Sequence, residues 1–231
     1  MNRMTQIAAG AFLVAQTFSG AALAASVTLS GTSVDFTFDD TLMGLFGQPT
    51  LSGDSLSFAP VNFSATSTNG EGYELTNNTV NVQMTVHYGY SFSSVDLAER
   101  GDYMMLGGGS TANVAGQVRV FDVNDPMMDT ITSIGPGAAM GQTGIGTHPW
   151  VAANSTDLSS WNGTKSVNVT FQNLLVALTN GSSSLAYVDK KYSGLTAITT
   201  AVTPVPEATS SAMMLAGLGL IGWHIRRRVR G

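Results

Sequence analysis

Apolar and polar side chains alternate along the middle of the chain. From Thr79 to Tyr90, every second residue is apolar or aromatic: Val80, Val82, Met84, Val86, Tyr88 and Tyr90. Polar residues take the positions between them. Successive side chains of a β-strand point to opposite faces, so this pattern predicts a half-buried strand of an antiparallel sheet. Both tyrosines are expected to face the core.

A second alternating segment spans residues 165–180. One parity carries Val167, Val169 and Phe171, and the other carries Leu174, Val176 and Leu178. We interpret the change of parity as a β-bulge or bend near Gln172 and Asn173, because an extra residue turns the following side chains to the other face.

Other parts of the domain carry weaker patterns. Shorter strands are predicted at residues 26–30, 32–38, 54–66, 103–106, 114–123, 129–134, 184–189 and 195–202. Turn signals such as Asn69-Gly70 and Asn180-Gly181 separate them. Short helical turns are expected at 41–46 and 95–99, and long loops over residues 136–164, which are rich in glycine, serine and threonine.

About ten short strands with frequent turns predict an all-β fold, an antiparallel β-sandwich of jelly-roll type. A β-barrel is the alternative. A parallel β-helix would need a repeat of fixed period, and none is present.

The N-terminal 25 residues have the layout of a signal peptide. Arg3 precedes an apolar run from Ile7 to Val14, and small residues follow, with a cleavage site expected after Ala24 or Ala25. The run is too short to span a bilayer. Residues 1–25 are therefore predicted to be a signal helix for the Sec translocon, and the β-sandwich domain to span 26–198.

The C-terminal end has three parts in a fixed order. A linker over residues 199–207 ends in the motif Val205-Pro206-Glu207, and an uncharged hydrophobic helix is predicted over 208–225. The Arg-rich end, residues 226–231, carries Arg226, Arg227, Arg228 and Arg230. Arginines beside an apolar stretch stay cytoplasmic. The stretch is short for a permanent transmembrane helix, which normally needs about 20 apolar residues.

This tripartite tail resembles the sorting signal of the PEP-CTERM proteins, with Ala208 where that motif usually has a second proline. The resemblance covers only the last part of the chain. It implies recognition by an exosortase-type processing enzyme of a Gram-negative bacterium and transient anchoring in the inner membrane. It also implies delivery to the cell surface or extracellular matrix, in association with exopolysaccharide and biofilm. A permanent tail anchor without processing is the alternative reading of the same segment.

Charge and composition narrow the possible partners. The chain has a net charge of −5, with fifteen acidic and ten basic residues. All the acids lie between Asp35 and Glu207, and five of the basic residues lie in the two terminal segments. Removal of the signal peptide and the C-terminal tail would therefore leave a protein with a more negative net charge. A nucleic-acid partner is excluded, because binding phosphates needs a basic face. The chain has no cysteine and therefore no disulfide.

We find no catalytic constellation and predict a protein without enzymatic activity or cofactor. A Ser-His-Asp hydrolase would need His87 or His148 as its base, and the sequence has no Gly-x-Ser-x-Gly motif to supply the nucleophile. A glycosidase needs two carboxylates about 5–9 Å apart. The acids that come closest in sequence lie near predicted turns and loops: Glu71, Glu74, Asp96, Glu99 and Asp102. A carbohydrate-active enzyme, a glycoside hydrolase or lyase on a sandwich scaffold, stays the alternative, because a fold can bring distant acids together.

The sequence leaves open whether the domain binds a structural calcium ion. Asp122, Asn124 and Asp125 place oxygen side chains after a predicted strand, and Asp39 with Asp40 is a second source. The first set lacks the glycine and the final glutamate of an EF-hand loop, and an Asx turn explains it equally well.

Sugar rings stack on flat aromatic side chains, so exposed aromatic residues are the candidates for sugar contact. Trp150 and Trp161 lie in the predicted loop region and are the best placed, with packing against the sandwich as the other reading. The sequence as a whole predicts an exported structural or adhesive/binding module. Extracellular polysaccharide is a candidate partner only through the resemblance to the PEP-CTERM proteins, and no ligand of the β domain is predicted.

Overall fold

The computed structural model describes residues 26–141, 143–202, 214–215 and 217–218. The predicted signal peptide and cleavage site, the sorting motif and the Arg-rich end lie outside these residues, as does nearly all of the predicted C-terminal helix. Within the described part of the chain, no helix is both long and apolar enough to cross a membrane.

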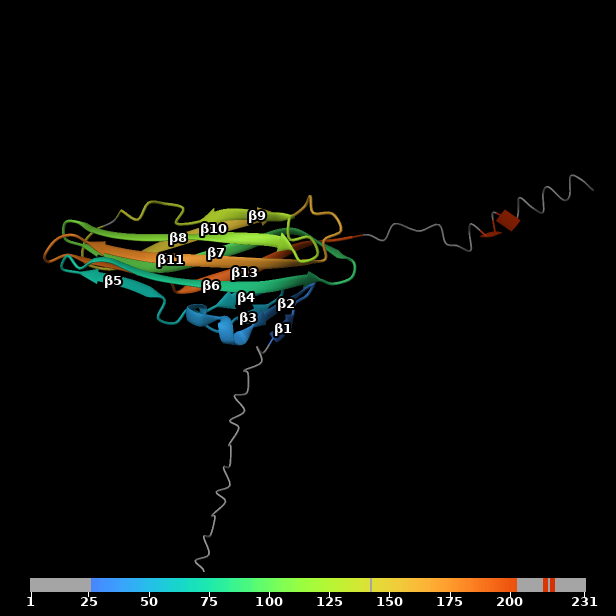
Figure 1. Cartoon of the computed structure of the whole chain (residues 1–231), viewed down its shortest axis with the longest axis horizontal. Coiled ribbons are helices and arrows are strands. Elements are labelled where there is room, and N and C mark those ends of the chain that lie inside the picture. The colour runs from blue at the N-terminus through green and yellow to red at the C-terminus, as the bar shows by residue number, and fades with distance from the viewer. Residues whose placement is uncertain (1–25, 142, 203–213, 216, 219–231) are drawn as a thin grey trace, which may run out of the picture.

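The described domain consists of two antiparallel sheets that enclose one hydrophobic core, and its long strands run along the longest axis of the molecule (Figure 1). Sheet A contains, in spatial order, β1 (Ser26–Ser30), β2 (Val34–Asp39), β6 (Gly72–Val86), β11 (Ser166–Thr179), β8 (Ser110–Asp122) and β9 (Asp129–Ile134). Sheet B is built around β7 (Tyr90–Leu106), with β10 (His148–Asp157) paired to it. Its other strands are β3 (Thr50–Ser52), β4 (Ser55–Phe58), β5 (Ser64–Thr68), β12 (Leu185–Asp189) and β13 (Tyr192–Ala201).

This architecture confirms the all-β prediction and has the two antiparallel sheets of a β-sandwich. The jelly-roll form stays a prediction. Two short 3-10 helices, η1 (Asp40–Leu42) and η2 (Gly44–Phe46), confirm the helical turns expected at 41–46.

Aromatic packing at the centre of the core fixes η2 between the sheets. The ring of Phe46 lies edge-on to three others, with centroid distances of 5.9 Å to Phe58, 5.3 Å to Phe63 and 5.1 Å to Phe171. Edge-to-face pairs contribute about 0.5–1.5 kcal/mol each beyond the area they bury. This cluster joins β4, β11 and the segment before β5 around one buried side chain.

Three sequence predictions about strand boundaries were wrong. Residues 95–99 lie inside β7 and not in a helical turn, and β10 occupies the centre of the region expected to form loops. The strand predicted to run from Thr79 to Tyr90 corresponds to β6 and ends at Val86, and Tyr88 is 99% exposed in the turn before β7. Gly89, with a φ of 86°, completes that turn, which is why the alternation does not continue to Tyr88.

The bulge predicted near Gln172 and Asn173 was also wrong. β11 keeps an unbroken register with both β6 and β8, and its inward positions run from Val167 through Asn173 to Thr179. Asn173 is thus a polar residue at a fully buried position of a continuous strand.

A bulge does occur between β12 and β13, which pair with successive parts of β7. Val188 pairs with Tyr103 and Tyr192 with Arg100, so three residues of this segment face two of β7. The extra residue changes the inward parity. As a result, Lys190 before the change and Ser193 after it both point into the core.

Candidate functional site

The outer face of sheet A carries a row of amide and hydroxyl side chains on β6 and β11. In the register of these strands, Gln83 pairs with Asn168 and Asn81 pairs with Thr170. Their neighbours along each strand are buried apolar residues, so the strand period itself directs these polar groups to solvent.

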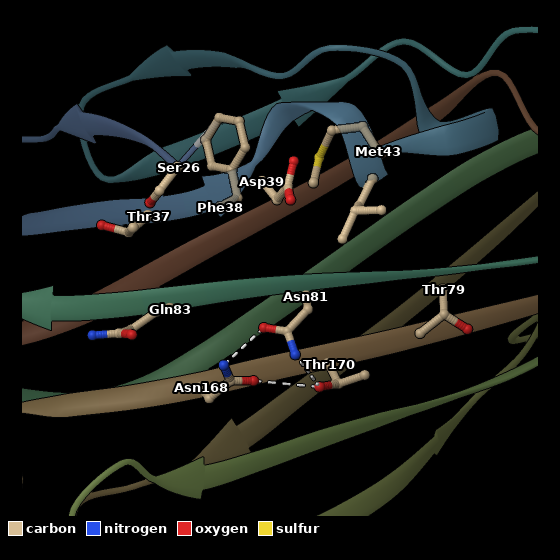
Figure 2. Close-up of a pocket in the computed structure, with 11 residues that line it drawn as sticks. Ser26, Thr37, Phe38, Asp39, Met43, Thr79, Asn81, Gln83, Asn168 and Thr170 are labelled. Carbon is tan, nitrogen blue, oxygen red and sulfur yellow. Dashed lines mark hydrogen bonds between the residues drawn. The ribbon is translucent and has the colours of Figure 1, made fainter. Parts of the chain in front are cut away.

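Hydrogen bonds between these side chains hold them in fixed positions. The Asn168 amide donates to Asn81 Oδ1 at 2.7 Å, and the Asn81 amide donates to Thr170 Oγ1 at 3.2 Å. Thr170 in turn donates to Asn168 Oδ1 at 3.3 Å, which closes a ring of three (Figure 2). Gln83 Nε2 donates to Ser166 Oγ at 3.1 Å.

A groove of about 440 Å³ lies beside this ring. β6 and β11 form one wall with the amides, and β2 and η1 form the other, with Phe38, Asp39 and Met43 across from them (Figure 2). Leu42 also lines the groove and is 66% exposed. The groove therefore combines fixed donors and acceptors with accessible apolar surface, as small-ligand sites do.

Charged groups lie at the edge of this face. His87 Nε2 and Asp35 Oδ1 are 2.9 Å apart. The hydrogen bond from His87 lowers the pKa of Asp35, and the same bond raises the pKa of His87. Asp39 in the groove accepts hydrogen bonds from the backbone N–H and hydroxyl of Thr41, which caps η1. Both carboxylates are thus held by local partners.

The two tryptophans expected to contact sugars lie elsewhere. Trp150 on β10 is only 3% exposed and donates its indole N–H to the backbone oxygen of Asp189 at 2.9 Å. Trp161 is partly buried and packs against the core. A side chain as covered as Trp150 has no free ring face to offer a sugar. Among the described residues, Tyr88 and Tyr73 are exposed aromatic residues, at 99% and 69%, and the sequence analysis selected neither of them.

The acids considered for catalysis have different local partners. Glu71 accepts hydrogen bonds from Thr68 in a turn, Asp96 accepts from Ser155, and Glu99 is buried in the core. Asp102 forms an ion pair with Lys191, and Glu74 lies on β6. In the described part of the chain these acids have different surroundings, and none of them lines the groove on sheet A.

The possible calcium ligands are used in a turn. Asp122 Oδ1 accepts from the backbone N–H of Asn124 at 2.8 Å, and Oδ2 accepts from Thr164 at 2.6 Å. The Thr164 hydrogen bond lowers the pKa of Asp122. Among the residues that the structure describes, no group of three or more His, Asp or Glu side chains is arranged to hold a metal ion. His148 begins β10, with its ring 5.6 Å from that of Tyr103.

Comparison with known proteins identifies the tail. Residues 204–228 match the PEP-CTERM protein-sorting motif, which includes Val205, Pro206 and Glu207 and reaches the arginine cluster. This match confirms the resemblance read from the sequence and implies processing by exosortase-type machinery. None of the curated proteins matches the chain.

Solved structures similar to the β domain share little sequence with it. TmCBM61, solved in complex with β-1,4-galactotriose, is 6% identical with a TM-score of 0.22, covering 58% of this chain and 88% of that one. Infectious bursal disease virus, Gx strain, is 10% identical with a TM-score of 0.26 over 76% of this chain and 51% of that chain. Bacteriophage CBA120 tailspike protein 4 is 11% identical with a TM-score of 0.22, covering 75% and 19%. The chain thus spans about half or less of the two viral chains.

Proposed function

We propose that this chain is an exported, non-enzymatic binding module of the cell surface or extracellular matrix, and that the groove on sheet A binds a polysaccharide. The observation that carries the export half is the PEP-CTERM motif at residues 204–228, which indicates a surface-directed protein. The proposal of polysaccharide binding rests on the hydrogen-bonded ring of Asn81, Asn168 and Thr170 beside the groove.

Export through the Sec translocon, transient anchoring in the inner membrane of a Gram-negative cell and cleavage near Glu207 make up the proposed route. Support comes from the order of charged and apolar segments at the two ends of the chain. The disposable tail follows the same logic as other signals in which a short apolar segment is removed after sorting.

The amide ring suits a ligand rich in hydroxyl groups. An amide presents an acceptor oxygen and two donor hydrogens, so it pairs with a hydroxyl in either direction. Because Asn81, Asn168 and Thr170 already hold one another in place, binding loses little side-chain entropy. Leu42, which lines the groove and is 66% exposed, offers apolar surface for the carbon face of a sugar ring.

The negative charge of the protein indicates which class of polysaccharide the groove would bind. The chain is acidic, and the described domain carries Asp35 and Asp39 beside the amide row. Like charges repel across an interface. We therefore expect a neutral polysaccharide and not an anionic one.

Two single substitutions test the groove as the binding site. The Asn81→Ala and Asn168→Ala variants each remove a hydrogen-bonding amide, and each loss of about 1 kcal/mol weakens binding by about fivefold. Titration against the neutral exopolysaccharide fraction of the native host measures the affinity. Asn113→Ala serves as the matched control, because Asn113 is exposed on the same sheet face and pairs with Val176, about 20 Å along β11 from Thr170.

Equal affinity of all three variants and the unchanged protein would remove the groove from the proposal. The enzymatic alternative makes a different prediction. Shortening of the polysaccharide by the purified protein, lost on substitution of a single carboxylate, would replace the binding function with a carbohydrate-active one.

A further inference from the structure

Three polar side chains meet in the middle of the hydrophobic core. Glu99 lies on β7 and Asn173 on β11, and Lys190 lies at the bulge between β12 and β13. We call these three residues the core triad. None belongs to the groove on sheet A. Asn173 is 0% exposed, and the side chains of Glu99 and Lys190 are likewise fully buried.

The core triad forms a closed ring of short contacts. Lys190 Nζ lies 2.6 Å from Glu99 Oε1 and donates to Asn173 Oδ1 at 2.6 Å. Asn173 Nδ2 donates to the other carboxylate oxygen, Glu99 Oε2, at 2.8 Å. A single carboxylate therefore touches both the lysine nitrogen and the nitrogen of the asparagine amide.

Aromatic rings surround the lysine nitrogen. Nζ lies 5.2 Å from the ring centroid of Phe46, 5.6 Å from that of Phe63 and 5.8 Å from that of Trp150. Burial disfavours charged groups, and it lowers the pKa of Lys190 to about 8. In such surroundings, transfer of a proton from Lys190 to Glu99 converts two buried charges into a neutral amine and a neutral acid.

We propose that Lys190 and Asn173 become joined by an intramolecular isopeptide bond, with Glu99 moving the protons. The Lys190 ammonium first gives a proton to Glu99. The neutral Nζ then attacks Cγ of Asn173, and a C–N bond forms. Glu99 delivers its proton to Nδ2 and takes one from Nζ, the Cγ–Nδ2 bond breaks, and ammonia leaves. Neither oxidant nor cofactor is needed.

The geometry places each reacting group beside its partner. Oδ1 is about 1.23 Å from Cγ, so the Nζ contact of 2.6 Å to Oδ1 leaves Nζ within about 3.8 Å of the carbon it attacks. This is close to the separation at which bound reactants react readily. Glu99 already contacts both the attacking and the leaving nitrogen, so one carboxyl group can serve as base and as acid.

The bond would tie the two sheets together. Asn173 belongs to sheet A, whereas Lys190 belongs to the segment joining two strands of sheet B. The chain has no cysteine, so a disulfide cannot provide such a link in an exported protein. The competing explanation is an ordinary buried ion pair with an asparagine beside it, which leaves all three side chains unmodified.

Peptide mapping of the full chain separates these two explanations. Trypsin cuts after Lys165 and after Lys190, which gives a peptide of residues 166–190 that contains both Asn173 and Lys190. The isopeptide bond blocks the cut after Lys190. We expect peptide 166–191 instead, with a mass one ammonia below the mass calculated from its sequence. In tandem mass spectrometry, backbone cleavage between Asn173 and Lys190 should release no fragments, because the isopeptide bond still holds the two parts together.

Glu99→Gln keeps the size and hydrogen bonding of the side chain but cannot take the proton, and we expect it to yield unmodified peptide 166–190. Asp96→Asn is the matched control, since Asp96 lies on the same strand but is half-buried outside the core and bonded to Ser94 and Ser155. That variant should retain the linked peptide. Circular dichroism of both variants checks that the strands still form.

One side reaction in the same peptide gives an equal mass change. Asn180 precedes Gly181, and ring closure of that asparagine also releases ammonia. It leaves the cut after Lys190 intact, and the Asn180→Ser variant cannot undergo it. An ammonia loss that disappears in Asn180→Ser would overturn the proposal, and so would unmodified peptide 166–190 as the main product of the unchanged protein.

Discussion

Individual polar residues at inward positions explain where sequence reasoning about this core succeeds and where it stops. Alternation correctly assigned Val80, Val82 and Phe171 to the interior. The same reasoning treated Asn173 as a break in a strand and Glu99 as part of a helical turn, because a polar residue at an inward position looks like a change of structure. Only the packing of one sheet against the other brings Glu99 of β7, Asn173 of β11 and Lys190 of the segment after β12 together, so that they satisfy one another.

At the edge of sheet A, the pair of His87 and Asp35 predicts a pH-dependent interaction. Their hydrogen bond raises the pKa of His87 and lowers that of Asp35. Asp35→Asn should bring the pKa of His87 down toward its ordinary value of about 6.5, as measured by NMR titration of the ring. Asp129→Asn removes an acid on another strand and should leave His87 unchanged.

The sign of the pH effect follows from these shifts. Because the folded pKa of His87 is raised, the stabilisation is present below about pH 6.5 and is lost as pH rises through the folded pKa. Because that of Asp35 is lowered, the stabilisation is also lost as pH falls through its folded pKa. A His87 pKa that is the same in the Asp35→Asn variant would contradict the assigned pairing.

Among the elements, the strands with strict alternation were predictable and the irregular segments were not. β6 and β11 follow from period two, and η1 and η2 from the short segment 41–46. β10 was not found, because it lies in a stretch rich in glycine and threonine where pairing with β7 outweighs weak local propensity. The bulge at 189–191 was not predicted, because residues 190–194 were assigned to no strand, so the change of inward parity between β12 and β13 could not be recognised.

Gly101 on β7 is the position that allows this bulge to lie against its partner strand. A Cβ atom added there would be 1.9 Å from the backbone oxygen of Asp189 and 2.7 Å from Nε1 of Trp150. Gly101→Ala should therefore lower the free energy of unfolding by about 1–3 kcal/mol, as overpacking in a core does.

The control is Gly108→Ala, in the turn after β7, where an added Cβ meets no atom within 4 Å. We expect that change to stay within about 0.5 kcal/mol in chemical denaturation. If the two alanine variants unfold at the same denaturant concentration, close packing at Gly101 is not what positions the bulge.

At the scale of the whole molecule, the sequence was informative about class and destination and uninformative about the site. The terminal motif and the alternation predicted a sorted, all-β protein, and both were confirmed. The groove was not predictable, because it arises where β2 and η1 approach the outer face of β6 and β11, and no local pattern encodes that approach. The tryptophans chosen as sugar contacts illustrate the difficulty, since a loop-like sequence around Trp150 folded into a paired strand.

The central claim is that a β domain is exported and released from its sorting tail. The intact mass of the protein purified from its native host tests it most directly. The account predicts a mass that lacks residues 1–24 or 1–25 and everything after a cut near Glu207, in the surface or extracellular fraction. A membrane-bound protein whose mass still includes Arg226, Arg227, Arg228 and Arg230 would contradict it, and would mean that the tail is a permanent anchor.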